Sequence, residues 1–195
     1  MYAMHHLATN YISDISLLSN FTSLTYLNLW SNQISDIFPL VDNEGLSVGD
    51  FVDLCLNPLD CEAYIIFIPQ LEGRGVTVYY DTPPYTIDAI VDFDPDTLNL
   101  RSKGKFVMVY IQLPLGYEVS QIDAVTIKLN GIVAALTTPT EIGDYNNDGI
   151  DDMMVKFDRA VVHSIINIDE LVEVIITGGL NGICFKGSDT IRVIE

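Results

Sequence analysis

The first 80 residues carry hydrophobic side chains in a pattern that returns along the chain. The phrase Asn-x-Ile-Ser-Asp-Ile occurs at Asn10–Ile15 and again at Asn32–Ile37, an offset of 22 residues (32 − 10 = 22). Around the second copy the spacing is L-x-x-L-x-L-x-x-N-x-I/L, formed by Leu24, Leu27, Leu29, Asn32, Ile34, Ile37 and Leu40. A fixed period of this length predicts stacked coils, because one such unit cannot bury its own hydrophobic face.

Asparagine occupies one position of this pattern three times. Asn10, Asn32 and Asn57 stand in equivalent places, with a second interval of 25 residues (57 − 32 = 25) and the extra residues in a Gly- and Asn-containing segment at 41–49. A side-chain amide can satisfy backbone groups that a tight turn would otherwise bury without partners. We therefore expect the asparagines to support the turns between coils.

These residues resemble bacterial leucine-rich repeat proteins of the internalin type, over residues 1–80. The segment from Asp50 to Val78 is similar to the unit that closes such arrays. The resemblance implies an α/β leucine-rich repeat solenoid fragment whose concave sheet binds a protein. Because His5 stands where a core leucine is expected, we expect the chain to hold the tail of a longer array; a short degenerate array is the alternative.

Candidate ligand-binding residues alternate with the core leucines and should face the concave sheet. Exposed aromatic side chains gathered on such a surface are typical of protein interfaces. Trp30, the single tryptophan, could instead cover a neighbouring coil. The predicted binding residues are Tyr26, Asn28, Trp30, Phe51 and Asp53.

The pattern changes after residues 81–86, where Pro83 and Pro84 predict a stiff connector. Short stretches rich in β-branched and aromatic residues follow, separated by turn-forming pairs such as Asn130-Gly131, and residues 159–166 suggest one short helix. We therefore expect an all-β antiparallel sandwich domain over residues 87–195. Its predicted strands are 87–93, 106–113, 125–129, 153–157, 171–177 and 190–194.

Composition narrows the classes of function. The 195 residues include 49% hydrophobic side chains, and 27 acidic against 9 basic residues give a formal charge of −18. This charge argues against a nucleic-acid partner, and no segment has the length of a membrane span. No signal peptide is visible at the N-terminus. Three scattered cysteines predict unpaired thiols, with a Cys55–Cys61 bridge as the alternative.

One acidic segment has the composition of a calcium loop. Oxygen-bearing side chains stand at loop positions 1, 3, 5 and 9, with Gly149 at position 6, as in EF-hands, dockerins and thrombospondin-type repeats. Val155 replaces the bidentate glutamate, so we expect a weak structural site, completed by Asp158, Glu141 or water; an acidic turn without an ion is the alternative. The predicted calcium ligands are Asp144, Asn146, Asp148, Ile150 through its carbonyl, and Asp152.

Together these features favour a non-enzymatic protein-interaction module of a larger surface or secreted protein. Two alternatives stay open. The first is a structural spacer or stalk; the second is part of a carbohydrate-active enzyme, suggested only by Asp92, Asp94 and Asp96. His163 lies in a hydrophobic run and is more typical of a packed helix residue than of a catalytic base.

Overall fold

The computed structural model of the chain describes residues 3–195 and divides into two compact units, the first ending at Pro83 and the second beginning at Pro84. The division falls inside the segment 81–86 that the two prolines mark in the sequence. We describe each unit by itself.

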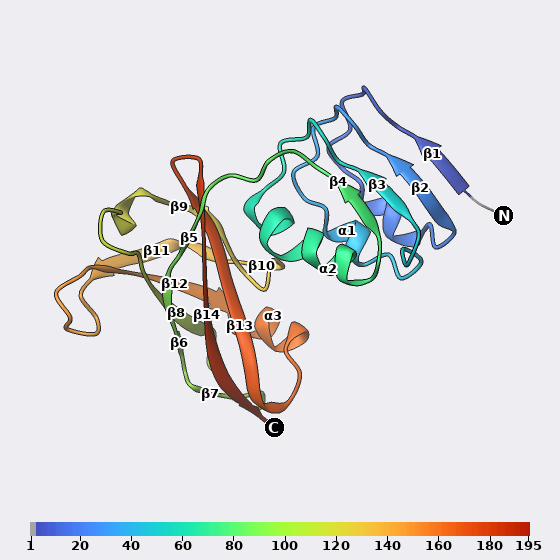
Figure 1. Cartoon of the computed structure of the whole chain (residues 1–195). Coiled ribbons are helices and arrows are strands. Elements are labelled where there is room, and N and C mark those ends of the chain that lie inside the picture. The colour runs from blue at the N-terminus through green and yellow to red at the C-terminus, as the bar shows by residue number, and fades with distance from the viewer. Residues whose placement is uncertain (1–2) are drawn as a thin grey trace. The chain divides into compact units, whose positions relative to one another are not determined.

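The first unit is built on a parallel sheet of four strands whose spatial order is their chain order (Figure 1). The register pairs Tyr26 with Phe51, and Asn28 with Asp53. Each strand is only three to five residues long. The strands are β1 (Ala3–His6), β2 (Leu24–Asn28), β3 (Phe51–Asp53) and β4 (Thr77–Tyr79).

Buried asparagines support the turns that follow these strands. The Asn32 amide donates to the carbonyls of Leu7 and Leu29 at 2.9 Å each, and its Oδ1 accepts from the backbone N–H of Ile12 at 3.1 Å. Asn57 repeats the arrangement one strand later, with two donated bonds of 3.0 Å and one accepted from Ile34 N. Each amide therefore satisfies backbone groups of two neighbouring turns.

Short helical segments connect the strands, and Ile15, Ile34 and Ile37 of the repeated phrase are buried. Asp60 accepts a hydrogen bond from Ala63 N at 3.0 Å at the start of the last helical stretch. The segments are the 3-10 helix η1 (Ser16–Asn20), α1 (Phe38–Val41), the π-helix η2 (Ala63–Phe67) and α2 (Ile68–Gly73).

The prediction of an α/β leucine-rich repeat solenoid is wrong, and with it the internalin-type resemblance. Strand makes up 42% of the chain and helix 17%, so the fold is mainly β, in three separate sheets. Within residues 3–195 no solenoid of leucine-rich repeats is formed. The two copies of the Asn-x-Ile-Ser-Asp-Ile sequence match the spacing of strands in a small parallel sheet of four strands. Two copies of a period are too few to establish a repeat architecture.

The second unit contains the other two sheets. One is a four-stranded antiparallel sheet in the order β11-β12-β8-β6, and the other has the order β10-β9-β13-β14-β5, with β7 also paired to β14. The four-stranded sheet comprises β11 (Leu136–Gly143), β12 (Asp152–Asp158), β8 (Phe106–Gln112) and β6 (Ile90–Asp94). The six-stranded sheet comprises β10 (Val133–Ala134), β9 (Ile122–Leu129), β13 (Asp169–Leu180), β14 (Ile183–Ile194), β5 (Thr86–Asp88) and β7 (Thr97–Asn99).

A single hydrophobic core joins these two sheets. Alternation places Val91 and Phe93 of β6 inward, while Ile90, Asp92 and Asp94 point outward. The long strands β13 and β14 form a hairpin whose turn has positive φ at Asn181 and Gly182 (Figure 1). The unit is not purely antiparallel as expected, because β5 and β7 both pair with β14 in parallel.

Two smaller helices complete the second unit. α3 (Arg159–Ile165) begins directly after β12, and the Asp158 carboxylate accepts from Ala160 N at 2.8 Å and Val161 N at 3.2 Å as its N-terminal cap. The 3-10 helix η3 (Val119–Gln121) precedes β9.

Candidate functional site

A row of aromatic rings crosses the outward face of the parallel sheet, one ring from each strand. The ring of His6 lies 5.3 Å from that of Tyr26, Tyr26 lies 4.9 Å from Phe51, and Phe51 lies 5.0 Å from Tyr79, measured between centroids. The central pair is stacked, with an interplanar angle of 7°. We call His6, Tyr26, Phe51 and Tyr79 the aromatic row.

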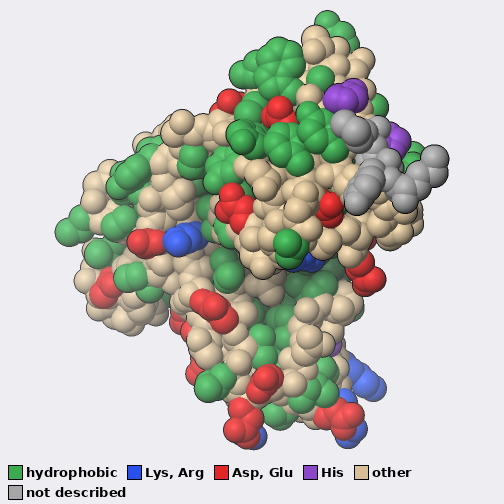
Figure 2. All heavy atoms as spheres, turned by 45° about the vertical axis from the view of Figure 1, so that its right-hand side comes forward, with side chains coloured by type: hydrophobic (Ala, Val, Ile, Leu, Met, Phe, Trp, Pro, Cys, Tyr) green, Lys and Arg blue, Asp and Glu red, His purple; other side chains and the backbone are tan. Residues whose placement is uncertain are grey.

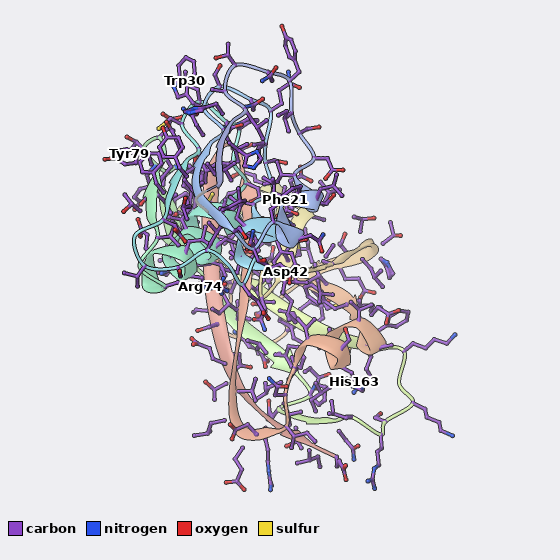
Figure 3. The ribbon with its side chains drawn as sticks, turned by 90° about the vertical axis from the view of Figure 1, so that its right-hand side faces the viewer. Phe21, Trp30, Asp42, Arg74, Tyr79 and His163 are labelled. Atoms are coloured by element: carbon purple, nitrogen blue, oxygen red, sulfur yellow. The ribbon has the colours of Figure 1, made fainter. Side chains whose placement is uncertain are left out.

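Trp30 extends this surface beyond the end of β2. Its side chain is 39% exposed and that of Tyr79 is 54% exposed. Figure 3 shows Trp30 and Tyr79 on the same side of the first unit, with Phe21 on another side. In Figure 2, hydrophobic side chains gather near the histidines, with a few acidic side chains among them.

The polar residues of this face hold the strand ends. Asn28 Oδ1 accepts from Trp30 N at 3.0 Å, and Asp53 Oδ1 accepts from Cys55 N at the same distance. Burial and the neighbouring Asp53 raise the pKa of the Cys55 thiol to about 11, so this free cysteine is protonated at neutral pH. The five predicted binding residues therefore share one face of two adjacent strands and their ends, and their role in binding stays a prediction.

Sequence reasoning missed Tyr79. The alternation in Thr77-Val78-Tyr79 places Tyr79 two positions after Thr77, which pairs with Phe51. The segment was predicted only as part of a closing unit. Extending the alternation of β2 and β3 into that segment would have found this residue.

The acidic loop between β11 and β12 folds on itself through its own carboxylates. Asp144 accepts from the N–H groups of Asp148 and Gly149 at 3.0 Å each, and Asn146 Oδ1 accepts from Asp148 N at 2.9 Å. Asp148 Oδ1 accepts from Ile150 N at 2.9 Å. The oxygens of Asp144, Asn146 and Asp148 therefore gather at one tight turn.

The loop is also fixed to the outer face of the four-stranded sheet. Gln112 Nε2 of β8 donates to Asp148 Oδ2 at 2.7 Å, and the Tyr145 ring lies 4.9 Å from the Tyr110 ring of β8. The hydrogen bond from Gln112 is the largest cause that lowers the pKa of Asp148. The sheet thus presets the conformation of the loop.

Of the other candidate ligands, Asp152 is hydrogen-bonded to the loop, whereas Asp158 lies away from it. Asp152, the first residue of β12, is 4% exposed and accepts from Tyr145 N at 2.9 Å. Asp158 caps α3 at the opposite end of β12, so it cannot complete a site in the loop. Glu141, the other candidate, accepts from the Tyr145 hydroxyl at 3.4 Å.

Between this loop and the sheet lies a hollow of about 230 Å³, which we call the acidic hollow. Asp92 on β6 pairs in register with Tyr110 on β8, and both contribute to its floor. Burial raises the pKa of Asp92, as do the carboxylates of Asp189, Asp96, Asp94 and Asp152. The lining residues are Ile90, Asp92, Tyr110, Tyr145, Asn146 and Asp152.

His163 lies in α3, where its Nε2 is buried without a hydrogen-bond partner. Burial and the nearby Arg159 lower the pKa of its imidazole. Figure 3 shows it on the helix, and its burial favours the neutral form of the ring, so no observation points to a catalytic base.

Comparison with known proteins adds little. No protein-family model and no curated protein matches the chain. One solved structure with a likeness to it comes from work on the host cell surface retention of a 1.5-MDa bacterial ice-binding adhesin, with 21% sequence identity, a TM-score of 0.32, and coverage of 60% of this chain and 34% of that one. The chain thus spans about a third of that structure's length. At this TM-score the likeness carries no argument about function.

Two further findings concern the surroundings of the protein. The chain holds one disulfide, whereas Cys55 is free, so the prediction of three unpaired thiols is wrong. None of the helices within residues 3–195 reaches the length and hydrophobicity that crossing a bilayer requires.

Proposed function

We propose that the chain is a non-enzymatic protein-interaction module of a surface-associated or secreted protein, and that it contacts its partner through the aromatic row. The observation that supports this most directly is the continuous series of ring contacts across all four parallel strands. Disulfide-bonded cysteines are typical of oxidising compartments and support a location outside the cytosol.

The geometry favours binding because the rings are already ordered. Tyr26 and Phe51 are half-buried and stack on each other, so little side-chain freedom is lost when a partner covers them. Trp30 and Tyr79 leave ring surface exposed beside them. Aromatic side chains are enriched among the residues that contribute most to protein–protein affinity.

A screen of displayed proteins against the whole chain would test the proposal. Tyr26→Ala and Trp30→Ala should each weaken capture of a bound protein by tenfold or more, as expected of central aromatic anchors. Tyr11→Ala is the matched control, since Tyr11 is 87% exposed in the first unit but outside the strands of the sheet. Unchanged capture by both face variants would contradict the proposed surface.

We also propose that calcium binds weakly to the acidic loop and stabilises the second unit. The fit is partial: Asp144, Asn146 and Asp148 bring oxygens together, and the Ile150 carbonyl and water would have to complete the six to eight ligands that calcium takes. Two of the converging side chains are carboxylates, which a cation would hold together against their repulsion. The expected dissociation constant is about 10⁻⁴ to 10⁻³ M.

Thermal unfolding in calcium and in EDTA would test this second proposal. At ~1 mM calcium and a dissociation constant of ~0.1 mM, the ion should add about 1.4 kcal/mol to the free energy of unfolding. Asp144→Ala should abolish the calcium-dependent part. Identical curves in calcium and EDTA for the parent protein would exclude the site.

A structural spacer is the competing function. It predicts that calcium changes the melting temperature while no protein is captured through the aromatic row. The capture screen and the calcium experiment therefore separate the two functions, because each measures one of the properties alone.

A further inference from the structure

The acidic hollow shares Asn146 with the proposed calcium loop, but its two carboxylates, Asp92 and Asp152, belong neither to the aromatic row nor to the side chains proposed to hold calcium. Asp152 is 4% exposed, and only its Oδ2 is occupied, by the N–H of Tyr145. Within the described part of the chain no side chain or backbone group donates to Oδ1. In residues 3–195, His163 Nε2 is the single side-chain atom that is both fully buried and without a hydrogen-bond partner. Asp152 Oδ1 also lacks such a partner, so it must be accessible to solvent. We place it toward the hollow, because Asp152 is one of the residues that line that space.

The charge around the hollow is unbalanced. Asp92 faces the same space, and every charged group that shifts its pKa is another carboxylate: Asp189, Asp96, Asp94 and Asp152. Placing carboxylates near one another in a partly desolvated site costs free energy unless a cation joins them. A cation bound in the hollow would therefore stabilise the folded protein, because it offsets the repulsion between these carboxylates.

The walls indicate which kind of cation fits. The rings of Tyr110 and Tyr145 lie 4.9 Å apart and are inclined by 49°, and aromatic faces attract ammonium and guanidinium groups. Ile90, 65% exposed, provides a hydrophobic edge. A volume of about 230 Å³ is far larger than a metal ion, and only two carboxylates line it.

We propose that the acidic hollow binds the cationic head of a lysine or arginine side chain between Asp92 and Asp152. The alkyl stem of that side chain lies against Ile90 and the two tyrosine rings. This site lies in the second unit and does not depend on the aromatic row of the first, so either proposal can fail while the other holds.

An NMR titration of the whole chain with small probes tests the proposal. N-acetyl-lysine amide and N-acetyl-arginine amide are the cationic probes, and N-acetyl-norleucine amide matches the lysine stem without the charge. Saturable shifts at the amides of Asp92, Tyr145 and Asn146 with at least one cationic probe, and none with norleucine, would support the site. Equal response to norleucine, or shifts confined to other residues, would overturn it.

Two variants sharpen the result. Asp92→Asn removes one charge from an exposed position without changing side-chain shape, and it should weaken the cationic probe about threefold to tenfold. Asp88→Asn makes the same change at an exposed position on β5, outside the hollow, and should leave affinity unchanged. Equal affinities for the parent and both variants, in proteins whose spectra stay dispersed, would overturn the role of Asp92.

A calcium titration in the same spectra separates this site from the loop. Calcium should shift Asp144 and Asp148 first, whereas the cationic probe should shift Asp92. If calcium competes one-to-one with the cationic probe for the site at Asp92, the assignment of that site to an organic cation is overturned.

Discussion

The aromatic row and the acidic hollow both use tyrosine, and they differ in what the rings contact. In the row, Tyr26 and Tyr79 pack on the ring of Phe51, so the surface is flat and hydrophobic. In the hollow, Tyr110 and Tyr145 stand beside carboxylates and enclose a space. The same side chain is therefore proposed to meet a protein surface in one place and a single positive charge in the other, because its neighbours decide which property is used.

The supports of the two surfaces differ as well. The row depends on strands whose turns are held by buried asparagine amides, whereas the hollow depends on a loop tied to a sheet with its own large core. A substitution that weakens the elements supporting one surface is therefore expected to leave the other surface intact.

The largest effect is expected from Asn57→Ala. It leaves the carbonyl of Leu54 and the N–H of Ile34 without their side-chain partner, while the carbonyl of Leu29 keeps only the Asn32 amide, at a cost of about 3 kcal/mol in unfolding free energy. Urea denaturation followed by Trp30, the one tryptophan, reports on the first unit. Asn20→Ala, at an exposed position in η1, is the control; an equal loss in both variants would contradict the role of the buried amide.

A somewhat smaller effect is expected from Phe51→Ala. The change removes the centre of the aromatic row and should cost about 2 kcal/mol, less than for a fully buried phenylalanine because the side chain is half-buried. Partner capture should fall about as far as it does for Tyr26→Ala, since each change takes the contact away from two neighbouring rings. Retained capture would break the link between ring order and binding.

Gln112→Ala should loosen the acidic loop, because it removes a hydrogen bond to the charged acceptor Asp148. Hydrogen exchange at the amides of Asp148 and Ile150 should become faster, and the pKa of Asp148, now lowered mainly by Gln112, should rise. Gln121→Ala on η3 is a control at an exposed glutamine. Unchanged exchange would show that the loop is ordered without the sheet.

The smallest effect concerns pH. The pKa of Asp92 is raised in the folded protein above the ordinary value of 3.8, so ionising it opposes folding; the penalty is absent below 3.8 and complete above the folded pKa. Asp92→Asn should therefore raise the melting temperature slightly at pH 7, with a difference that shrinks as the pH falls towards 3.8. A difference independent of pH would contradict the raised pKa.

Local pattern located many elements correctly. The predicted helix at 159–166 corresponds to α3, and the predicted turn at Asn130-Gly131 joins β9 to β10, because both depend on residues adjacent in sequence. Asn32 and Asn57 were also expected to hold turns, and their hydrogen bonds show how. The period of 22 residues was over-interpreted as a solenoid, since spacing describes one unit and not how far stacking continues.

The sequence by itself determined where strands, turns and acidic oxygens lie, because alternation, glycine at positive φ and short-range capping act within a few residues. Only the tertiary structure decided which side chains meet: Tyr79 with Phe51, Gln112 with Asp148, and Asp92 with Asp152 across one hollow. Those residues are separated by 28 or more positions (79 − 51 = 28), and strand order and register, set by burial of the whole core, bring them together.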